Sequence, residues 1–225
     1  MSQSKKNTYC HRLWDEVYIN ERGNIYSCCH QKPRRMGNIY NRKLIDIINN
    51  RRMEEYRRRS LNGKLHCFKH CNLLHKRELL NLKSSSIIDY SELQRLKISF
   101  GQGCNINCIM CWQNSKSKRN LDYDKIVKNV DITPFESIEI QGGEPLFIPS
   151  AKKFFDYVAS KGKKVSLLTN GTLINKKWAE KIALHSDFIN ISLNAATKET
   201  HEFINRGSRW NIVLRNLQRL NYARD

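Results

Sequence analysis

The amino-acid sequence predicts an α/β fold in which a small, cysteine-rich α+β domain precedes a parallel sheet. Two observations support this prediction. Apolar strands alternate with helices over the second half of the chain, and five of the eight cysteines lie in the first 71 residues. With 225 residues, 40% of them hydrophobic, the chain is long enough for one large or two modest domains and can bury a core.

The first region, residues 8–73, opens with a predicted hairpin. The segment EVYINERGNIYSCC reads as two short strands around Glu21-Arg22-Gly23-Asn24. Its alternation places Val17, Ile19 and Ile25 on one side. We therefore expect one buried and one solvent-facing side in this hairpin.

A helix is predicted next, over KLIDIINNRRMEEYRRRSL (43–61). Its apolar stripe consists of Leu44, Ile45, Ile47, Ile48 and Met53. Glu54 and Glu55 are spaced to pair with Arg58 and Arg59, which favours a solvated helix face over a dedicated phosphate groove. The cysteine-bearing loop HCFKHCN follows, and residues 74–93 form a connecting region.

The second region, residues 94–225, alternates strand and helix. The expected strands are LKISF (96–100), SIEIQ (137–141), KVSLLT (164–169) and FINISL (188–193). The expected helices lie near 122–130, 149–160, 175–184 and 209–222. Such units predict a parallel sheet with right-handed crossovers, open or barrel-like. Polar or glycine-rich groups stand at the carboxyl ends of all four strands, where ligands of such sheets bind, which predicts one shared site.

The chain is strongly basic, with 40 Lys and Arg against 21 Asp and Glu and a net charge of +19. This charge suggests an acidic partner such as nucleic acid, an anionic peptide or an acidic protein surface. A Lys-, Asn- and Ile-rich sequence with solvated faces is the alternative. No apolar run approaches the roughly 20 residues of a membrane span, and no secretory signal is visible, so we expect a cytoplasmic protein without a membrane partner.

Three cysteines lie within eight residues: Cys104, Cys108 and Cys111. Disulfides are rare in a reducing cytosol, so clustered cysteines favour metal or iron–sulfur ligation. Zinc sites in proteins usually take four ligands. Three thiolates with no fourth nearby therefore suggest a centre with one position open to a substrate or cofactor.

The spacing CxxxCxxC after the first strand, with QGGEP (141–145) after the second, resembles the radical S-adenosylmethionine (radical SAM) superfamily. The resemblance covers roughly 94–222 and implies a partial (β/α) barrel. It implies that the three cysteines hold a [4Fe–4S] cluster whose fourth iron chelates S-adenosylmethionine. Reductive cleavage would then release a 5′-deoxyadenosyl radical that abstracts a substrate hydrogen, with electrons from a flavodoxin- or ferredoxin-type protein.

The resemblance also assigns roles in cofactor binding. Gly142 and Gly143 would let the backbone approach the methionine group, Glu144 would accept a hydrogen bond from its ammonium, and Pro145 would fix the turn. The later residues implied near the ribose, substrate or cofactor carboxylate are Thr169, Asn170, Ser192, Asn194 and Arg206. An Asn-Gly turn is the alternative for Asn170, a surface position is the alternative for Arg206, and superfamily members often have Asp where Asn194 stands. Met110 would lie near adenine or in the core.

The remaining cysteines resemble the SPASM-type auxiliary domain, over residues 8–73. The matching pattern comprises Cys10, Gly23 to Cys28, Gly37-Asn38-Ile39, Cys67 and Cys71. It implies an auxiliary iron–sulfur cluster held by Cys10, Cys28, Cys67 and Cys71, with Cys29 spare or exchanging with Cys28, and it suggests peptide or protein modification. Zinc is the alternative, because His30, His66 and His70 lie beside these cysteines.

The superfamily core usually has six strand–helix units, and about four can be placed in this sequence. We therefore expect either a shortened or fragmentary core, or a partner or second copy that supplies the rest of the barrel. The competing hypothesis is a non-catalytic metal-binding module that docks nucleic acid or protein through its basic surface. It predicts that Gly143 and Glu144 are dispensable and that binding weakens steeply with salt.

Overall fold

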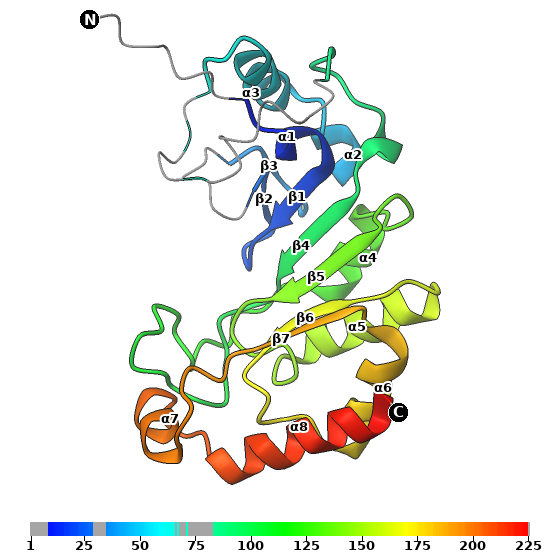
Figure 1. Ribbon diagram of the computed structural model, residues 1–225. Helices are drawn as coiled ribbons and strands as arrows, with labels where there is room; N and C mark the ends of the chain where they lie inside the picture. Colours follow the sequence, from blue (N-terminus) through cyan, green and yellow to red (C-terminus); the bar gives the residue numbers. More distant parts are fainter. Residues whose placement is uncertain (1–8, 29–34, 66, 68–70, 72–82, 225) are drawn as a thin grey trace, which may run out of the picture. The chain divides into compact units, whose positions relative to one another are not determined.

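The computed structural model describes residues 9–28, 35–65, 67, 71 and 83–224 (Figure 1). The chain divides into two compact units. The first unit comprises Met1–Ile19, Gly23–Lys97 and Asp124–Phe135, and the second comprises Asn20–Arg22, Ile98–Tyr123 and Glu136–Asp225. The domain boundaries expected from the sequence, at 73 and 94, stay predictions. None of the helices among the described residues is long and apolar enough to cross a membrane.

The first unit contains the predicted hairpin. After the short helix α1 (Arg12–Asp15), β1 (Glu16–Ile19) pairs antiparallel with β2 (Asn24–Tyr26), and β2 pairs antiparallel with β3 (Gly37–Asn38). Val17, Ile19 and Ile25 are all buried. The alternation in the sequence therefore identified the core side of the hairpin correctly.

The single helix predicted over 43–61 is wrong, because the chain forms two helices there. These are α2 (Leu44–Ile47) and α3 (Arg51–Leu61). The Asn50 side chain accepts hydrogen bonds from the backbone N–H groups of Arg52 and Met53, so it begins a new helix where the apolar pattern suggested continuity. Ile45, expected in the apolar stripe, has 53% of its surface exposed.

The basic run 51–60 forms the predicted ion pair between Glu55 and Arg59, yet it also contains a fully buried cation. Arg57 donates hydrogen bonds to Leu13 O at 2.8 Å, Asn49 Oδ1 at 3.0 Å and Ser86 O at 3.1 Å. Burial lowers the pKa of Arg57 to about 10. This guanidinium ties α3 to α1 and to the segment that precedes β4, so the run is more than a solvated face.

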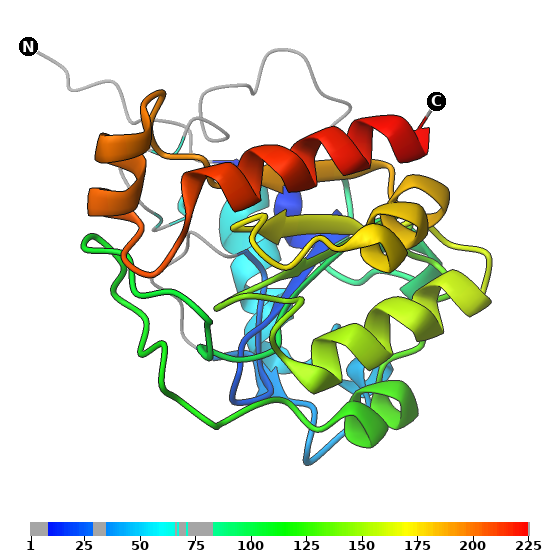
Figure 2. The same cartoon turned by 90° about the horizontal axis from the view of Figure 1, so that it is seen from below.

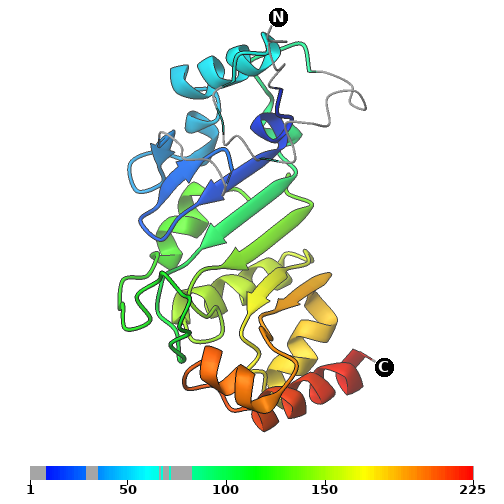
Figure 3. The same cartoon turned by 60° about the vertical axis from the view of Figure 1, so that its left-hand side comes forward.

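The second unit is built on the predicted parallel strands (Figure 3). They are β5 (Ser137–Gln141), β6 (Ser166–Thr169) and β7 (Phe188–Ile191), paired in that order. The preceding strand, β4 (Arg95–Ser99), starts in the first unit, where Gln94 N donates to Asp15 O at 2.9 Å. It leads into the second, where Phe100 N donates to Gln141 O at 3.3 Å. All four strands lie within two residues of their predicted positions.

The four predicted helices are also present. They are α4 (Tyr123–Asn129), α5 (Pro149–Ser160), α6 (Lys176–His185) and α8 (Trp210–Arg224). A 3-10 helix (Tyr90–Glu92) lies in the connecting region. Helix α5 packs on the sheet through Phe154, whose ring centroid lies 5.2 Å from that of Phe100, and α8 lies against α6 (Figures 1 and 2). A further short helix, α7 (Lys198–Ile204), was not predicted.

Candidate functional site

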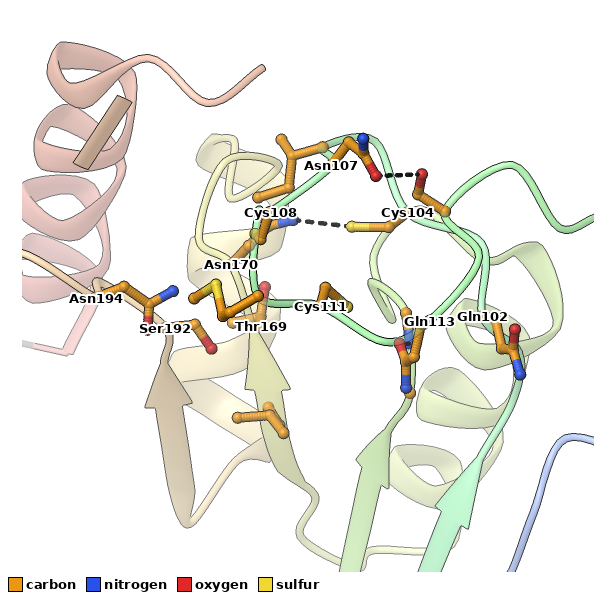
Figure 4. Close-up of a pocket in the computed structure, with 16 residues that line it drawn as sticks. Gln102, Cys104, Asn107, Cys108, Cys111, Gln113, Thr169, Asn170, Ser192 and Asn194 are labelled. Carbon is orange, nitrogen blue, oxygen red and sulfur yellow. Dashed lines mark hydrogen bonds between the residues drawn. The ribbon is translucent and has the colours of Figure 1, made fainter. Parts of the chain in front are cut away.

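A cavity of about 260 Å³ lies in the second unit at the carboxyl ends of the parallel strands. Figure 4 shows the loop that bears Cys104, Cys108 and Cys111 beside the strand ends. The lining includes these three cysteines and seven further residues singled out from the sequence: Met110, Gly142, Gly143, Thr169, Asn170, Ser192 and Asn194. Residues from four strand ends thus line one cavity, as the strand–helix pattern predicted.

The three thiols provide a donor set suited to iron. Cys104 and Cys108 are half-buried and Cys111 is exposed. Burial raises the pKa of Cys104 and of Cys108 above the usual value for a thiol. In the part of the chain that the structure describes, no three His, Cys, Asp or Glu side chains are already arranged around a metal position. Soft sulfur donors on one loop facing one cavity nevertheless fit an iron–sulfur cluster. The cysteines lose their protons when they bind the cluster as thiolates.

Backbone hydrogen bonds hold the cysteine loop in place. Asn107 N donates to Arg206 O at 2.8 Å, and Ile109 N donates to Ile204 O at 2.9 Å. At the start of the loop, Cys104 N donates to Ser115 O at 2.9 Å. The end of α7 therefore supports the cysteine loop, a role that the sequence analysis did not predict.

The two glycines of the QGGEP turn allow close approach of the chain to itself. Both have positive φ, 88° at Gly142 and 40° at Gly143. A Cβ atom would lie 2.0 Å from Ser99 Oγ at Gly142 and 2.1 Å from Gly103 O at Gly143. The turn is thus pressed against the strand and loop that lead to Cys104. An approach of these glycines to a bound methionine group stays a prediction.

We expect Gly143→Ala to destabilise the protein by roughly 2–3 kcal/mol and to lower its iron content, because the added Cβ must displace Gly103 beside Cys104. Gly162→Ala is the matched control. It also has positive φ, of 70°, but nothing lies within 4 Å of its added Cβ, so it should cost only about 1 kcal/mol. Urea denaturation and iron analysis measure both effects. Equal losses in the two variants would contradict this account of the turn.

Glu144 is fully buried and is not part of the cavity lining. Its Oε1 accepts from Leu146 N at 3.0 Å and Thr169 Oγ1 at 2.8 Å, and its Oε2 accepts from Asn170 N at 2.7 Å. Burial raises the pKa of this carboxyl, while the three hydrogen bonds act in the opposite direction. The carboxylate therefore ties the QGGEP turn to the end of β6, and both of its oxygens already accept hydrogen bonds from the protein.

The other residues implied by the resemblance differ in their placement. Asn170 donates through Nδ2 to Cys104 Sγ at 3.5 Å (Figure 4), so its amide faces a thiol as well as forming part of a turn. Asn194 lines the cavity with a φ of 61°, the only positive φ of a non-glycine residue in the described chain. Pro145 is buried outside the lining, and the side chain of Arg206 is exposed and also outside it. The cofactor contacts proposed for all four stay predictions.

Sequence reasoning missed several polar residues at this site, and three of them contact the cysteine loop or the glycine turn. Gln102 and Gln113 line the cavity, and Gln113 Oε1 accepts from Gly143 N at 2.7 Å. Both stand two residues outside the cysteine motif, and this proximity could have identified them. Asn205, whose Oδ1 lies 3.3 Å from Cys108 Sγ, stands 97 positions away in the chain and had no such signal.

Four further thiols among the described residues lie in the first unit. Cys10 is buried, whereas Cys28, Cys67 and Cys71 are half-buried. Burial, with smaller contributions from the charges of Cys28, Cys67 and Cys71, raises the pKa of Cys10 to about 12, so the four lie near enough to interact. Cys29 and the histidines His30, His66 and His70 lie outside the described residues. The choice between Cys28 and Cys29 therefore stays open.

Comparison with known proteins identifies two family matches. The sequence model of the radical SAM superfamily matches residues 98–223, and that of the SPASM iron–sulfur cluster-binding domain matches residues 10–72. Among curated proteins, the antilisterial bacteriocin subtilosin biosynthesis protein AlbA of Bacillus subtilis is 32% identical over 106 residues, covering 44% of this chain and 24% of AlbA. A probable GTP 3′,8-cyclase of Methanothermobacter thermautotrophicus is 29% identical over 117 residues, covering 49% of this chain and 38% of the cyclase.

Among solved structures, Streptococcus suis SuiB bound to precursor peptide SuiA is similar with a TM-score of 0.47 and 16% identity. The match covers 98% of this chain and 54% of SuiB. This chain spans less than half the length of the two curated relatives named above.

Proposed function

We propose, from the premise that this chain belongs to the radical SAM superfamily and has an N-terminal SPASM domain, that it modifies a peptide or protein by radical chemistry. The superfamily, the SPASM domain and its N-terminal position are as predicted from the cysteine and glycine motifs. These domains imply a [4Fe–4S] cluster, S-adenosylmethionine and an auxiliary iron–sulfur cluster. When bound, the first cluster and S-adenosylmethionine supply the reductive cleavage that generates a 5′-deoxyadenosyl radical.

The observation that most supports the proposal is that three thiols on a single loop face a cavity whose other sides are formed by other segments of the chain. Cys104, Cys108 and Cys111 would hold the cluster. The space beside them is bounded by the Gly142–Gly143 turn and by the ends of β6 and β7. A small molecule can therefore take the coordination position that the protein leaves open.

A peptide substrate is supported by the SPASM domain and by the similarity to AlbA, whose name refers to bacteriocin biosynthesis. The similarity to a GTP cyclase makes a nucleotide the competing substrate class. The first unit contains a groove of about 530 Å³ lined by Arg42, Lys43, Lys125 and Lys128, with Asp46 as its single carboxylate. Its charge supports an acidic segment in the substrate or partner.

Other partners and the location of the protein also belong to the proposal. We infer an electron donor of the flavodoxin or ferredoxin type. Strand β7 is the last in the strand order of the described chain, and its Phe188 has 61% of its surface exposed. The edge position of β7 supports pairing with a second copy or a partner that completes the barrel, and exposed Phe188 is an apolar side chain that such a partner could cover. A cytoplasmic location stays a prediction.

We expect the anaerobically reconstituted, dithionite-reduced protein to convert S-adenosylmethionine to 5′-deoxyadenosine, because the three thiols and the polar strand ends line the same cavity. Liquid chromatography of the product and analysis of iron and sulfide measure this activity. Deuterated acidic peptides and deuterated GTP, tested in parallel, would identify the substrate class by transfer of deuterium into 5′-deoxyadenosine. Full cluster loading without any 5′-deoxyadenosine would favour the non-catalytic metal-binding module.

A further inference from the structure

Asn205 connects a candidate cluster ligand to the wall of the cofactor cavity. It stands at the end of α7 and is 1% exposed. Its Oδ1 accepts from Cys108 Sγ at 3.3 Å and from Asn194 Nδ2 at 2.8 Å. Its Nδ2 donates to Leu193 O at 3.3 Å. One buried amide therefore contacts both Cys108 and a residue that lines the cavity.

The contact with Cys108, as it stands, suits a thiol and not a metal-bound sulfur. A thiol can donate its proton to Asn205 Oδ1, whereas a sulfur bound to iron has no proton and can only accept. A carboxamide can resolve this conflict, because a half turn of the amide group exchanges its oxygen for its NH₂. A carboxylate of the same size cannot, since both of its ends are acceptors.

Asn170 shows the orientation that an iron-bound sulfur requires. Its Oδ1 accepts from Thr172 N at 2.9 Å and from Thr172 Oγ1 at 2.7 Å, which fixes the direction of the amide. Its Nδ2 consequently donates toward Cys104 Sγ. The amide beside Cys104 is thus already set for a metal-bound sulfur, and the amide beside Cys108 is not.

A turn of the Asn205 amide has a consequence at Asn194. The NH₂ group of Asn205 would then face the NH₂ group of Asn194, so Asn194 must turn in the same step to present its oxygen. The turn would also move the NH₂ group of Asn205 away from Leu193 O, which keeps His201 Nδ1 as a partner, and would bring the amide oxygen to His201 Nδ1, which lies 3.1 Å from Asn205 Nδ2. His201, 1% exposed, lies 2.6 Å through Nδ1 from Leu193 O and 2.9 Å through Nε2 from Ser208 Oγ. Because the ring of His201 is fixed by these contacts, the amides of Asn205 and Asn194 are the groups that can change orientation when Cys108 binds iron.

We propose that Asn205 is a positioning residue for Cys108, whose amide turns its NH₂ to the iron-bound sulfur and re-orients Asn194 at the cofactor cavity. The inference rests on the proposed function, because it requires a cluster on Cys104, Cys108 and Cys111. Outer-shell partners of metal ligands typically contribute about 10- to 100-fold to metal affinity. Hydrogen bonds to cluster sulfurs also tune the reduction potential.

The test compares Asn205→Asp and Asn205→Ala with Asn190→Ala in the reconstituted full-length protein. Asn190 is an exposed asparagine on β7, outside the cavity lining. One readout is the rate of iron loss to a chelator. Another is the reduction potential of the cluster whose electron paramagnetic resonance (EPR) signal changes when S-adenosylmethionine is added. A third is thermal unfolding of the iron-free protein.

Both Asn205 variants should lose iron from this cluster about 10-fold faster than wild type or more, and Asn205→Asp should be the worse because it places a negative charge beside the sulfur. Their reduction potential should become more negative, since reduction loses a stabilising N–H donor. Asn190→Ala should match wild type in both. Asn205→Asp keeps the size of the side chain and the acceptor for Asn194, so it tests the proposal even where Asn205→Ala does not fold.

Wild-type rates and potentials in the Asn205 variants would overturn the inference and leave the proposed function intact. Lower melting temperatures of the iron-free variants, with an unchanged cluster potential, would also overturn it by showing a purely structural role. Failure of the wild-type protein to bind a cluster at Cys104, Cys108 and Cys111 would instead refute the proposed function itself.

Discussion

Replacing Cys104, Cys108 and Cys111 together by alanine is expected to remove one iron–sulfur cluster and to abolish 5′-deoxyadenosine formation. No other cysteine and no histidine lines the cavity among the described residues, so nothing in its wall can substitute for the lost thiolates. The auxiliary cluster should remain, since its proposed ligands lie in the other unit. Iron and sulfide quantification, together with the cleavage assay, measures both parts of this prediction.

The reciprocal variant provides the control. Replacement of Cys10, Cys28, Cys67 and Cys71 by alanine should remove the auxiliary cluster and leave the EPR response to S-adenosylmethionine. Equal loss of iron from both clusters in either variant would refute two separate sites. Loss of zinc in place of iron from the second variant would favour the zinc alternative for the first unit.

Glu144→Ala is expected to cost roughly 3 kcal/mol or more in the free energy of unfolding. It leaves the N–H groups of Leu146 and Asn170 and the hydroxyl of Thr169 without their acceptor in a buried place. The same change removes the hydrogen bonds between the QGGEP turn and the end of β6, so the protein should also retain less of its iron–sulfur cluster. Urea denaturation followed by circular dichroism measures the first effect. A change of less than about 1 kcal/mol would contradict the buried role.

Glu144→Gln tests the electrostatic part of that role. Burial raises the pKa of Glu144 above its usual 4.5, so the folded state binds the proton more tightly than the unfolded state. The stabilisation from this raised pKa is present below pH 4.5 and is lost as pH rises through the folded-state pKa. The neutral glutamine should remove that decline. Parallel pH profiles for wild type and Glu144→Gln would contradict the raised pKa.

Much of the fold followed from local sequence patterns. The four parallel strands were predictable because runs of apolar residues alternate with helical segments, and the hairpin was predictable because Val17, Ile19 and Ile25 alternate with polar residues. The break at Asn50 was not, since the apolar spacing continues across it and only the cap ends the pattern. Helix α7 was missed because its seven residues are mostly polar.

The candidate site was predictable where its residues are adjacent in sequence and not where contacts act through space. The cysteine spacing and the two glycines identified the loop and the turn. The hydrogen bonds of Glu144 depend on β6 reaching the QGGEP turn, and the contact between Asn205 and Cys108 depends on α7 packing under the cysteine loop. The burial of Arg57 was not predictable for a related reason, because two of its three acceptors, Leu13 O and Ser86 O, come from segments distant in the sequence.

The central claim is that the three cysteines leave one iron position for S-adenosylmethionine. EPR of the reduced protein, with S-adenosylmethionine labelled by ¹⁵N in its amino group and ¹⁷O in its carboxylate, tests this claim most directly. We predict that the cofactor changes the cluster signal and that both labels show hyperfine coupling to it. An unchanged signal without coupling, in protein loaded with its full complement of iron, would contradict the claim.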